Sequence, residues 1–347
     1  MGFGQRALES MVVLNILYQF NEKYVPYAGV SITSLLENNR DADEINIYAL
    51  TEGISASSRD TLTKLIEGYG RKIHFPDTAD LIKRFKSMGM IPYRGAYSVY
   101  LRLFFTELLP VDAHRVIYLD SDTIVDGSLL PLAEYDLGGK TLGMVLESIT
   151  DDYKIMIGMK KEDEYYNSGV ILFDADAWRR ENYCDRLVDH IRNVRSSYIG
   201  DQDFLNIVCC GDVCRLPIEY NFQPLHGRYT PAQYFSCFGQ NPYYSRTEVE
   251  ASNHPVIFHC YRWLGEFPWN KGNLHPFNDV YDKYIRISSF SGVQKVRAHS
   301  GIVLGIEKIL YRMLPRVIFI RIFRMAHERM LRQAEADARA MKENRNS

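Results

Sequence analysis

The sequence lacks the cysteine pattern, the long apolar runs and the charge imbalance that mark several large functional classes. Its six cysteines include no C-x-x-C pair, which argues against a zinc site or a disulfide framework and favours reduced thiols. The formal net charge of −2 provides no protein-wide basic field, so we expect no nucleic-acid partner. The apolar run that begins at Met11 is too short to span a bilayer or to serve as a signal peptide.

A glycine-rich phosphate loop is also missing. The first apolar segment, 12–18, is followed by Gln19, Phe20 and Asn21 rather than by the glycines that let a loop wrap a phosphate. This disfavours a nucleotidyltransferase that makes a sugar nucleotide, which is retained only as an alternative function.

What the sequence does contain is an alternation of apolar strands and helices, which is typical of a doubly wound α/β sheet. We expect a polar N-terminal extension over 1–10, one large domain over 11–290 and a separate tail over 291–347. The segment 77–97 has weak periodicity and is a candidate lid. Strands are expected at 12–18, 44–50, 72–75, 114–125, 142–147, 169–174 and 256–259, with helices at 25–37, 57–69 and 100–109.

The most informative stretch is 114–125, in which a buried apolar strand leads into two carboxylates, Asp120 and Asp122. In an open α/β sheet ligands bind at the carboxyl ends of such strands. An extended strand would place both carboxylates on one face, where they could share one divalent ion, and that ion could offset the charge of a diphosphate.

Three further Asp-x-Asp triplets show that this pattern alone is weak evidence. One lies in a polar turn, and another precedes a helix, where N-capping is a sufficient explanation. Helix N-capping is also the alternative interpretation for the first aspartate of the last triplet. The triplets are Asp41/Asp43, Asp174/Asp176 and Asp201/Asp203.

Four segments in order resemble glycosyltransferase family 8, which includes glycogenin and the bacterial glucosyl- and galactosyltransferases of lipopolysaccharide synthesis. The segments are 120–122, 166–170, 200–206 and 259–269. The resemblance covers roughly residues 11–285, and the ordered set is far more specific than any single motif. It implies the GT-A fold, a Rossmann-like mixed sheet with helices on both faces.

The resemblance implies that Asp120, Asp122 and His259 bind a divalent ion that bridges the diphosphate of a UDP-sugar. Mixed carboxylate and imidazole ligands suit Mn²⁺ better than Mg²⁺, which remains the alternative ion. For His259 by itself, a hydrogen-bonded core histidine is the competing interpretation.

The resemblance also implies a nucleotide site. Tyr24 is expected to stack on uracil, with Asn21 at the base edge. Arg102 matches a family arginine near the nucleotide, although a solvated helix arginine is the alternative. The full set expected to bind the donor nucleotide is Gln19, Asn21, Tyr24, Arg102, Ser121, Gly265 and Lys271.

One departure from the family lies in the last motif, where Phe267 occupies the place of a lysine that meets the diphosphate. A cation elsewhere must replace that charge. Lys271 and Arg262 are the nearest candidates, and the hypothesis favours Lys271.

The family transfers sugars with retention of the anomeric configuration. Gln202 matches the position near the anomeric carbon, and a carboxamide is a poor nucleophile, so same-face attack is expected. Asp201, Asn167 and Glu147 are expected to hold sugar hydroxyls of the donor or acceptor.

The tail over 291–347 is basic and amphipathic. Such a sequence can lie on an anionic bilayer surface, and the alternative is a helix packed on the domain. We therefore expect a cytoplasmic enzyme at the inner face of the plasma membrane. Its expected reaction moves glucose or galactose from a UDP-hexose to a glycan or lipid-linked acceptor, and a degenerate sugar-binding protein is the alternative.

Overall fold

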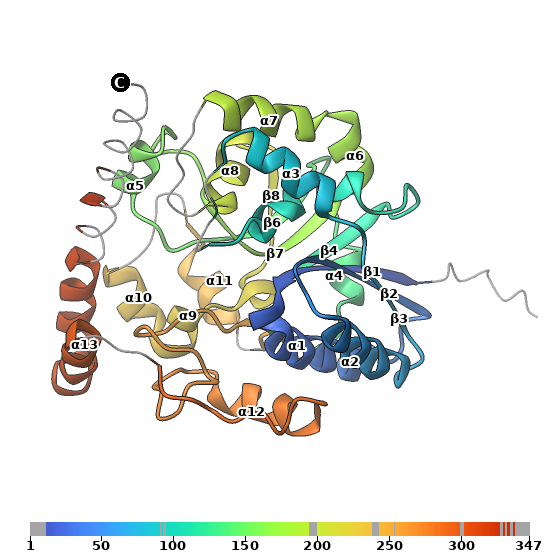
Figure 1. Ribbon diagram of the computed structural model, residues 1–347. Helices are drawn as coiled ribbons and strands as arrows, with labels where there is room; N and C mark the ends of the chain where they lie inside the picture. The colour runs from blue at the N-terminus through green and yellow to red at the C-terminus, as the bar shows by residue number, and fades with distance from the viewer. Residues whose placement is uncertain are drawn as a thin grey trace, which may run out of the picture.

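The computed structural model describes residues 12–90, 92, 95–193, 200–237, 243–252, 254–298, 302–326, 329, 332–333 and 336. The expected extension over 1–10 lies outside them. At the centre is a seven-stranded sheet with the order β3-β2-β1-β4-β7-β6-β8 (Figure 1). Its strands are β1 (Val13–Asn21), β2 (Glu44–Glu52), β3 (Lys72–His74), β4 (Arg115–Asp120), β6 (Leu142–Leu146), β7 (Tyr166–Asp174) and β8 (Val213–Arg215).

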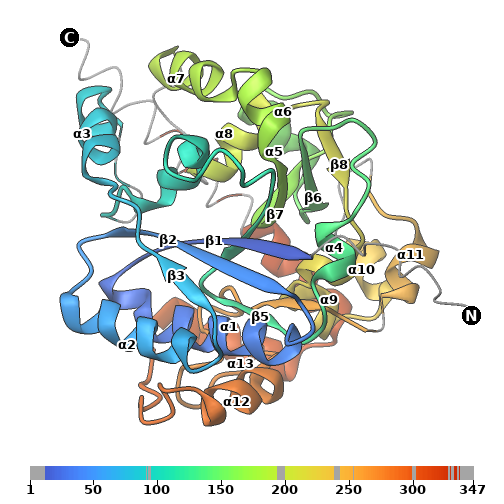
Figure 2. The same ribbon diagram turned by 90° about the vertical axis from the view of Figure 1, so that its right-hand side faces the viewer.

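The sheet is mixed, as the sequence predicts. β1 pairs in parallel with β2 and with β4, and β2 pairs in parallel with β3. β7 instead runs antiparallel to both of its neighbours, β4 and β6. Helices α1 (Val25–Asn38) and α2 (Ala56–Glu67) cover one face, and α6 (Ala175–Arg180), α7 (Tyr183–Asn193) and α8 (Asp201–Val208) cover the other (Figures 1 and 2). Coverage on both faces explains why the central strands are apolar without alternation.

One of the expected helices is wrong in type. The segment expected as an amphipathic helix over 100–109 is a 3-10 helix, η2 (Ser98–Glu107), which leaves helical geometry at Phe104. Its residues from Tyr100 to Phe105 are all buried, so this part of η2 has no solvent face and packs between the sheet and α8. The segment 77–97, noted for its weak periodicity and as a candidate lid, contains a helix, α3 (Ala79–Ser87).

The acidic stretch is also not one extended strand. β4 ends at Asp120, a turn follows, and β5 (Thr123–Val125) joins a second, two-stranded sheet with β9 (Ile257–His259). Thr123 lies opposite His259 in that sheet. The turn therefore places the two carboxylates beside the histidine by strand pairing rather than by a shared strand face.

The remaining helices lie in the second half of the chain. α12 (Asn278–Ile287) docks on α1, where the Asn38 amide donates to the Tyr284 hydroxyl oxygen at 2.7 Å. α13 (Ile302–Met313) belongs to the predicted tail. The others are η1 (Glu22–Tyr24), α4 (Leu130–Ala133), α5 (Asp151–Met156), η3 (Ile218–Asn221), α9 (Pro224–Arg228), α10 (Pro231–Cys237) and α11 (Arg246–Ala251).

The described part of the tail packs on the domain on one side and is exposed on the other. Tyr311, Phe319 and Ile320 are buried in a cluster with Trp263 and Leu264. The opposite side exposes Ile306, Ile309 and Met313. Among the described residues, none of the helices has the length and apolar character needed to cross a membrane.

Candidate active site

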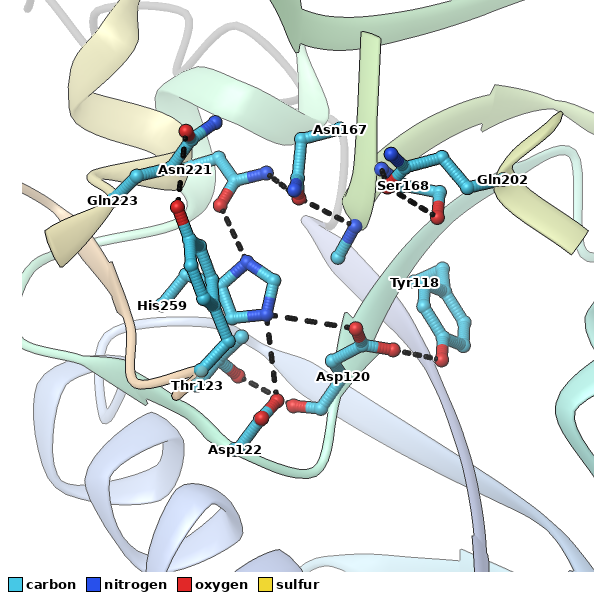
Figure 3. Close-up of polar contacts among 12 residues, drawn as sticks. Tyr118, Asp120, Asp122, Thr123, Asn167, Ser168, Gln202, Asn221, Gln223 and His259 are labelled. Carbon is cyan, nitrogen blue, oxygen red and sulfur yellow. Dashed lines mark hydrogen bonds and ion pairs between the residues drawn. The ribbon is translucent and has the colours of Figure 1, made fainter. Parts of the chain in front are cut away.

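Asp120, Asp122 and His259 converge at the carboxyl end of β4. The Nε2 atom of His259 lies 3.4 Å from an Asp122 carboxylate oxygen and 3.6 Å from one of Asp120 (Figure 3). One ligand atom from each residue can be chosen so that all lie within 4.8 Å of one another. Oxygen and imidazole ligands of one divalent ion typically lie about 3 Å apart, so these three side chains fit such an ion with small adjustments.

The electrostatics of this cluster also favour the binding of a cation. Burial raises the pKa of Asp120; the Arg102 charge opposes this rise and the Asp122 charge adds to it. Burial alone would lower the pKa of His259, but its hydrogen bond to Asp122 and the carboxylate charges raise it overall. A divalent ion would relieve the repulsion between the two buried carboxylates and leave the imidazole neutral as a ligand.

A chain of side-chain amides fixes the histidine ring. Asn167 Nδ2 donates to the Glu147 carboxylate at 2.5 Å, so its Oδ1 accepts from Asn221 Nδ2 at 2.8 Å. Asn221 Oδ1 then lies 3.0 Å from His259 Nδ1 and accepts a hydrogen bond from its N–H. This order leaves Nε2 facing Asp120 and Asp122, so that a neutral imidazole would offer its lone pair there, as a metal ligand requires.

Gly169 gives the ring its space. A Cβ atom built at Gly169 would lie 2.0 Å from Cε1 of His259 and 2.4 Å from Nδ1. The residue lies on β7, next to Asn167, whose Oδ1 accepts the Gly169 N–H at 2.9 Å. The glycine in the 166–170 segment is therefore required for close approach of the backbone to the ligand histidine.

Arg102 is not a solvated helix arginine. Its side chain is 5% exposed and pairs with Asp201, and it donates to the Ser168 carbonyl at 2.7 Å and to the Ser168 hydroxyl at 2.9 Å. It also reaches Asp120 at 3.2 Å and lies over the Tyr118 ring. Burial lowers the pKa of Arg102, but the charge and hydrogen bond of Asp201, together with the charges of Tyr118 and Asp120, raise it overall.

Asp201 and Gln202 begin α8 and face this guanidinium. The N-capping alternative for Asp201 is wrong, because the N-cap residue is Gly200 and the Asp201 side chain is buried against Arg102. Burial raises the pKa of Asp201 to about 6, against the opposing effect of Arg102. Gln202 Oε1 accepts from the Ser168 N–H at 3.0 Å, and its Nε2 donates to the Tyr165 hydroxyl oxygen at 3.2 Å.

Two residues expected to bind the base are engaged with the protein. Gln19 donates to the Val99 carbonyl at 2.9 Å and accepts the Arg102 backbone N–H at 3.0 Å, so it fastens η2 to β1. Asn21 Oδ1 caps η1 by accepting the Lys23 N–H at 3.1 Å.

The first loop nevertheless meets the last motif. The Tyr24 ring contacts Tyr27 edge to face, and Tyr27 stacks on Trp269 with 4.0 Å between ring centres. Trp269 in turn stacks on Phe267 at 4.3 Å. The two segments expected to bind the donor nucleotide, about 240 residues apart in the sequence, are therefore joined by a continuous row of aromatic rings.

The candidate cations of the last motif lie in different surroundings. The Arg262 guanidinium lies 5.3 Å from the centre of the Phe267 ring, the residue in the lysine's place. The Lys271 side chain is exposed, and its backbone N–H donates to the Val296 carbonyl at 3.0 Å. Ser121 is buried in the turn between the two ligand aspartates, and Gly265 has a φ of +74° in a tight turn.

Sequence reasoning missed Asn221 and Tyr118. Tyr118 donates to Asp120 and so turns the other carboxylate oxygen toward the histidine; its strand spacing of two from Asp120 was the available signal. Asn221 and Gln223 are fully buried amides that alternate with aromatic residues. Two amide residues within an otherwise apolar segment are the sequence signal that could have pointed to them.

Fold and site together define the class: an α/β protein whose mixed sheet carries a candidate divalent-metal centre beside the loop that follows β1, which is expected to bind a nucleotide. The model of the glycosyl transferase family 8 matches residues 15–271, so the chain belongs to that family. The resemblance seen in the sequence is thereby confirmed.

Curated relatives agree. A putative glycosyltransferase of Haemophilus influenzae is 28% identical over 61% of this chain and 64% of its own length. The lipopolysaccharide 1,2-glucosyltransferase of Escherichia coli is 27% identical over 60% of this chain and 62% of its own. The chain thus spans less than two thirds of the length of these two relatives.

The solved structure of the galactosyltransferase LgtC with donor and acceptor sugar analogs superposes with a TM-score of 0.65. It is 24% identical and covers 80% of this chain and 96% of its own. The likeness confirms the GT-A fold.

Replacing Arg102 with methionine should destabilise the protein most at high pH. The ionised Asp201 would then be buried without a partner, at a cost of about 3–5 kcal/mol. Arg102 lowers the pKa of Asp201, so its removal raises that pKa further above the pKa of an unfolded aspartate, and falling pH then protonates Asp201 and reduces this cost. Urea unfolding from pH 8 to pH 5 should show the deficit shrinking.

The matched control is Arg84→Met. Arg84 pairs with Glu107 at the surface, where each side chain is more than a third exposed. Its loss should cost less than about 1 kcal/mol and show no such trend. A deficit for Arg102→Met that is independent of pH, or no larger than that of the control, would contradict the account.

Proposed function

We propose that the protein transfers a hexose, glucose or galactose, from a UDP-sugar to a glycan or lipid-linked acceptor in cell-surface polysaccharide synthesis. The observation that carries the proposal is the convergence of Asp120, Asp122 and His259 in a chain that belongs to glycosyltransferase family 8. A lipopolysaccharide glucosyltransferase among the relatives supports the acceptor class.

The donor set supports a divalent ion, with Mn²⁺ favoured over Mg²⁺ because an imidazole joins two carboxylates. Asp120, Asp122 and His259 would hold the ion, which would supply a positive charge to the departing diphosphate. The chain's own contribution is to fix these ligands: Tyr118 and Arg102 orient Asp120, and Asn221 orients His259.

The contacts of Gln202 support transfer with retention by same-face attack. Its Oε1 is held by the Ser168 N–H and hydroxyl, and it is a carboxamide, so it is poorly suited to form a covalent sugar intermediate. Asp201 is neutralised by Arg102. Glu147, whose pKa is raised by burial, and Asn167 line the same region and are proposed to face the sugar hydroxyls.

Tyr24 is proposed to contact the uracil ring, because its own ring lies beside the aromatic row of Tyr27 and Trp269. Ser121 and Gly265 are proposed to offer backbone groups at the turns beside the diphosphate. A catalytically degenerate nucleotide-binding protein is the second candidate, and Phe267 in place of the family lysine favours it.

A screen of UDP-sugars with MnCl₂ tests the proposal. The wild-type protein should release UDP from UDP-glucose or UDP-galactose, more rapidly once a suitable acceptor is added, and chelation of the metal should stop release. Asp122→Ala should reduce the rate by about a hundredfold or more, because the ion loses a ligand.

The outcomes separate the two candidates. Asp174→Ala, at a helix N-cap outside the site, is the control and should keep its rate after correction for folded protein. Binding of UDP without turnover of any UDP-sugar would favour the degenerate binding protein.

A pair of variants identifies the cation that replaces the family lysine. Lys271→Ala tests the original hypothesis, and Arg262→Ala tests the residue that lies over Phe267. The variant that removes the diphosphate contact should raise the donor KM by about tenfold, since a charge-assisted hydrogen bond contributes about 1.5–3 kcal/mol. An unchanged donor KM in either variant excludes that residue.

We also propose that the tail binds an anionic membrane surface on the cytoplasmic side. The exposed apolar side chains Ile306, Ile309 and Met313, among tail arginines, support this. Ile309→Glu should weaken co-sedimentation with vesicles that contain phosphatidylserine, because it puts a negative charge on the contact face. Val111→Glu, at an exposed valine outside the tail, is the control. Equal sedimentation of both variants would contradict the proposal.

A further inference from the structure

The loop that follows the ligand histidine contains a tight turn with an unfavourable backbone. Trp263 N–H donates to the Glu266 carbonyl at 2.7 Å, and Glu266 N–H donates to the Trp263 carbonyl at 3.0 Å. Between them Leu264 has a φ of +48° and Gly265 a φ of +74°. Glycine tolerates this region, but a leucine is sterically disfavoured there and persists only when its surroundings hold it.

Helix α13 supplies those surroundings. Leu264 is buried in a cluster with Tyr311 and, beyond the helix, Phe319 and Ile320. A Cβ atom on Gly265 would lie 2.6 Å from a methyl carbon of Leu304, so the turn's backbone is in direct contact with the helix. The strained conformation of the turn thus depends on packing from a segment about 40 residues further along the chain.

A buried ion pair joins the same two elements. Glu266, with a side chain 5% exposed, binds Lys308 of α13 through Oε1, and the Lys308 side chain is 19% exposed. Its other oxygen, Oε2, has no hydrogen-bond partner among the described residues. Removing Lys308 would therefore leave a carboxylate buried without compensation, and the turn would have to open for it to reach water.

The turn lies inside the segment that the proposed function assigns to the donor. It is flanked by Arg262 on one side and by Phe267 on the other, and Trp269 links the segment to Tyr27 beside the first loop. A shift of the turn would move these groups together. Precise placement of such groups is what controls the affinity for a charged ligand.

We infer that α13 is a positioning element of the donor site: Lys308, acting through Glu266, and Leu304, packing on Gly265, hold the 262–269 loop in its binding conformation. The inference rests on the proposed function for the identity of the ligand but not for the state of the loop. The side of α13 that packs on the loop thus has a role that is separate from the role of its exposed apolar side.

The test compares Lys308→Met with Arg312→Met in the full-length chain. Both remove one positive charge from α13, but Arg312 is exposed. Backbone hydrogen exchange over 262–270 reports the loop, and calorimetric titration with UDP and MnCl₂ reports the donor site. Lys308→Met should speed exchange of the Trp263 and Glu266 amides and weaken UDP binding by about tenfold, whereas Arg312→Met should match wild type.

A double variant tests the mechanism. Glu266→Gln/Lys308→Met removes both charges, so no unpaired carboxylate is buried. The exchange rate in the loop and the UDP affinity should therefore return toward wild type. If Lys308→Met proves too unstable to purify, Leu304→Ala loosens the same contact without burying a charge and should also speed exchange in the loop.

The outcomes distinguish this inference from the proposed function. Wild-type protein that fails to bind UDP defeats the proposed function, while the exchange data still decide the role of α13. Exchange over 262–270 that is unchanged in both Lys308→Met and Leu304→Ala overturns the inference. Faster exchange with unchanged UDP affinity also overturns it, because the loop would then not position the donor.

Discussion

The arrangement of this site depends on one buried cation, the guanidinium of Arg102. It is held among the end of β4, the beginning of β7 and the beginning of α8 through Asp120, Ser168 and Asp201. A charge without water must be matched on every side, so the three elements have little freedom relative to one another. Gln19 adds to this by tying the backbone of Arg102 to β1.

Around Arg102, hydrogen bonds from neighbouring side chains hold Asp120 and His259 in fixed orientations. Tyr118 and Arg102 occupy one oxygen of Asp120, and the amides of Asn167 and Asn221 fix His259 from behind. Asp120 and His259 therefore each present one defined atom toward Asp122. Such preorganisation lets a site bind a cation strongly without reordering its side chains.

The sequence was sufficient for the sheet and the family, because apolar runs and ordered motifs are local signals. It also singled out Asp120 and Asp122 by their spacing, whereas His259 was added only by the family resemblance. It failed where tertiary contacts decide. The central residues of η2 are buried on all sides, so the spacing of its apolar residues could not reveal a 3-10 helix. The role of Arg102 depends on Asp201, which is 99 residues away. The chain of side-chain amides through Asn221 also joins distant segments, and no spacing in the sequence reveals it.

The reversed direction of β7 has a consequence for how such a protein can diversify. Because β7 is antiparallel to β4, its beginning, with Asn167 and Gly169, lies beside the end of β4. The connection that enters β7 over 147–165 therefore opens onto the same rim as the loops that leave β1 and β4. Changes in its length or composition would reshape the rim of the candidate site and leave the parallel half of the sheet intact, so the surroundings of the site can vary through one connection.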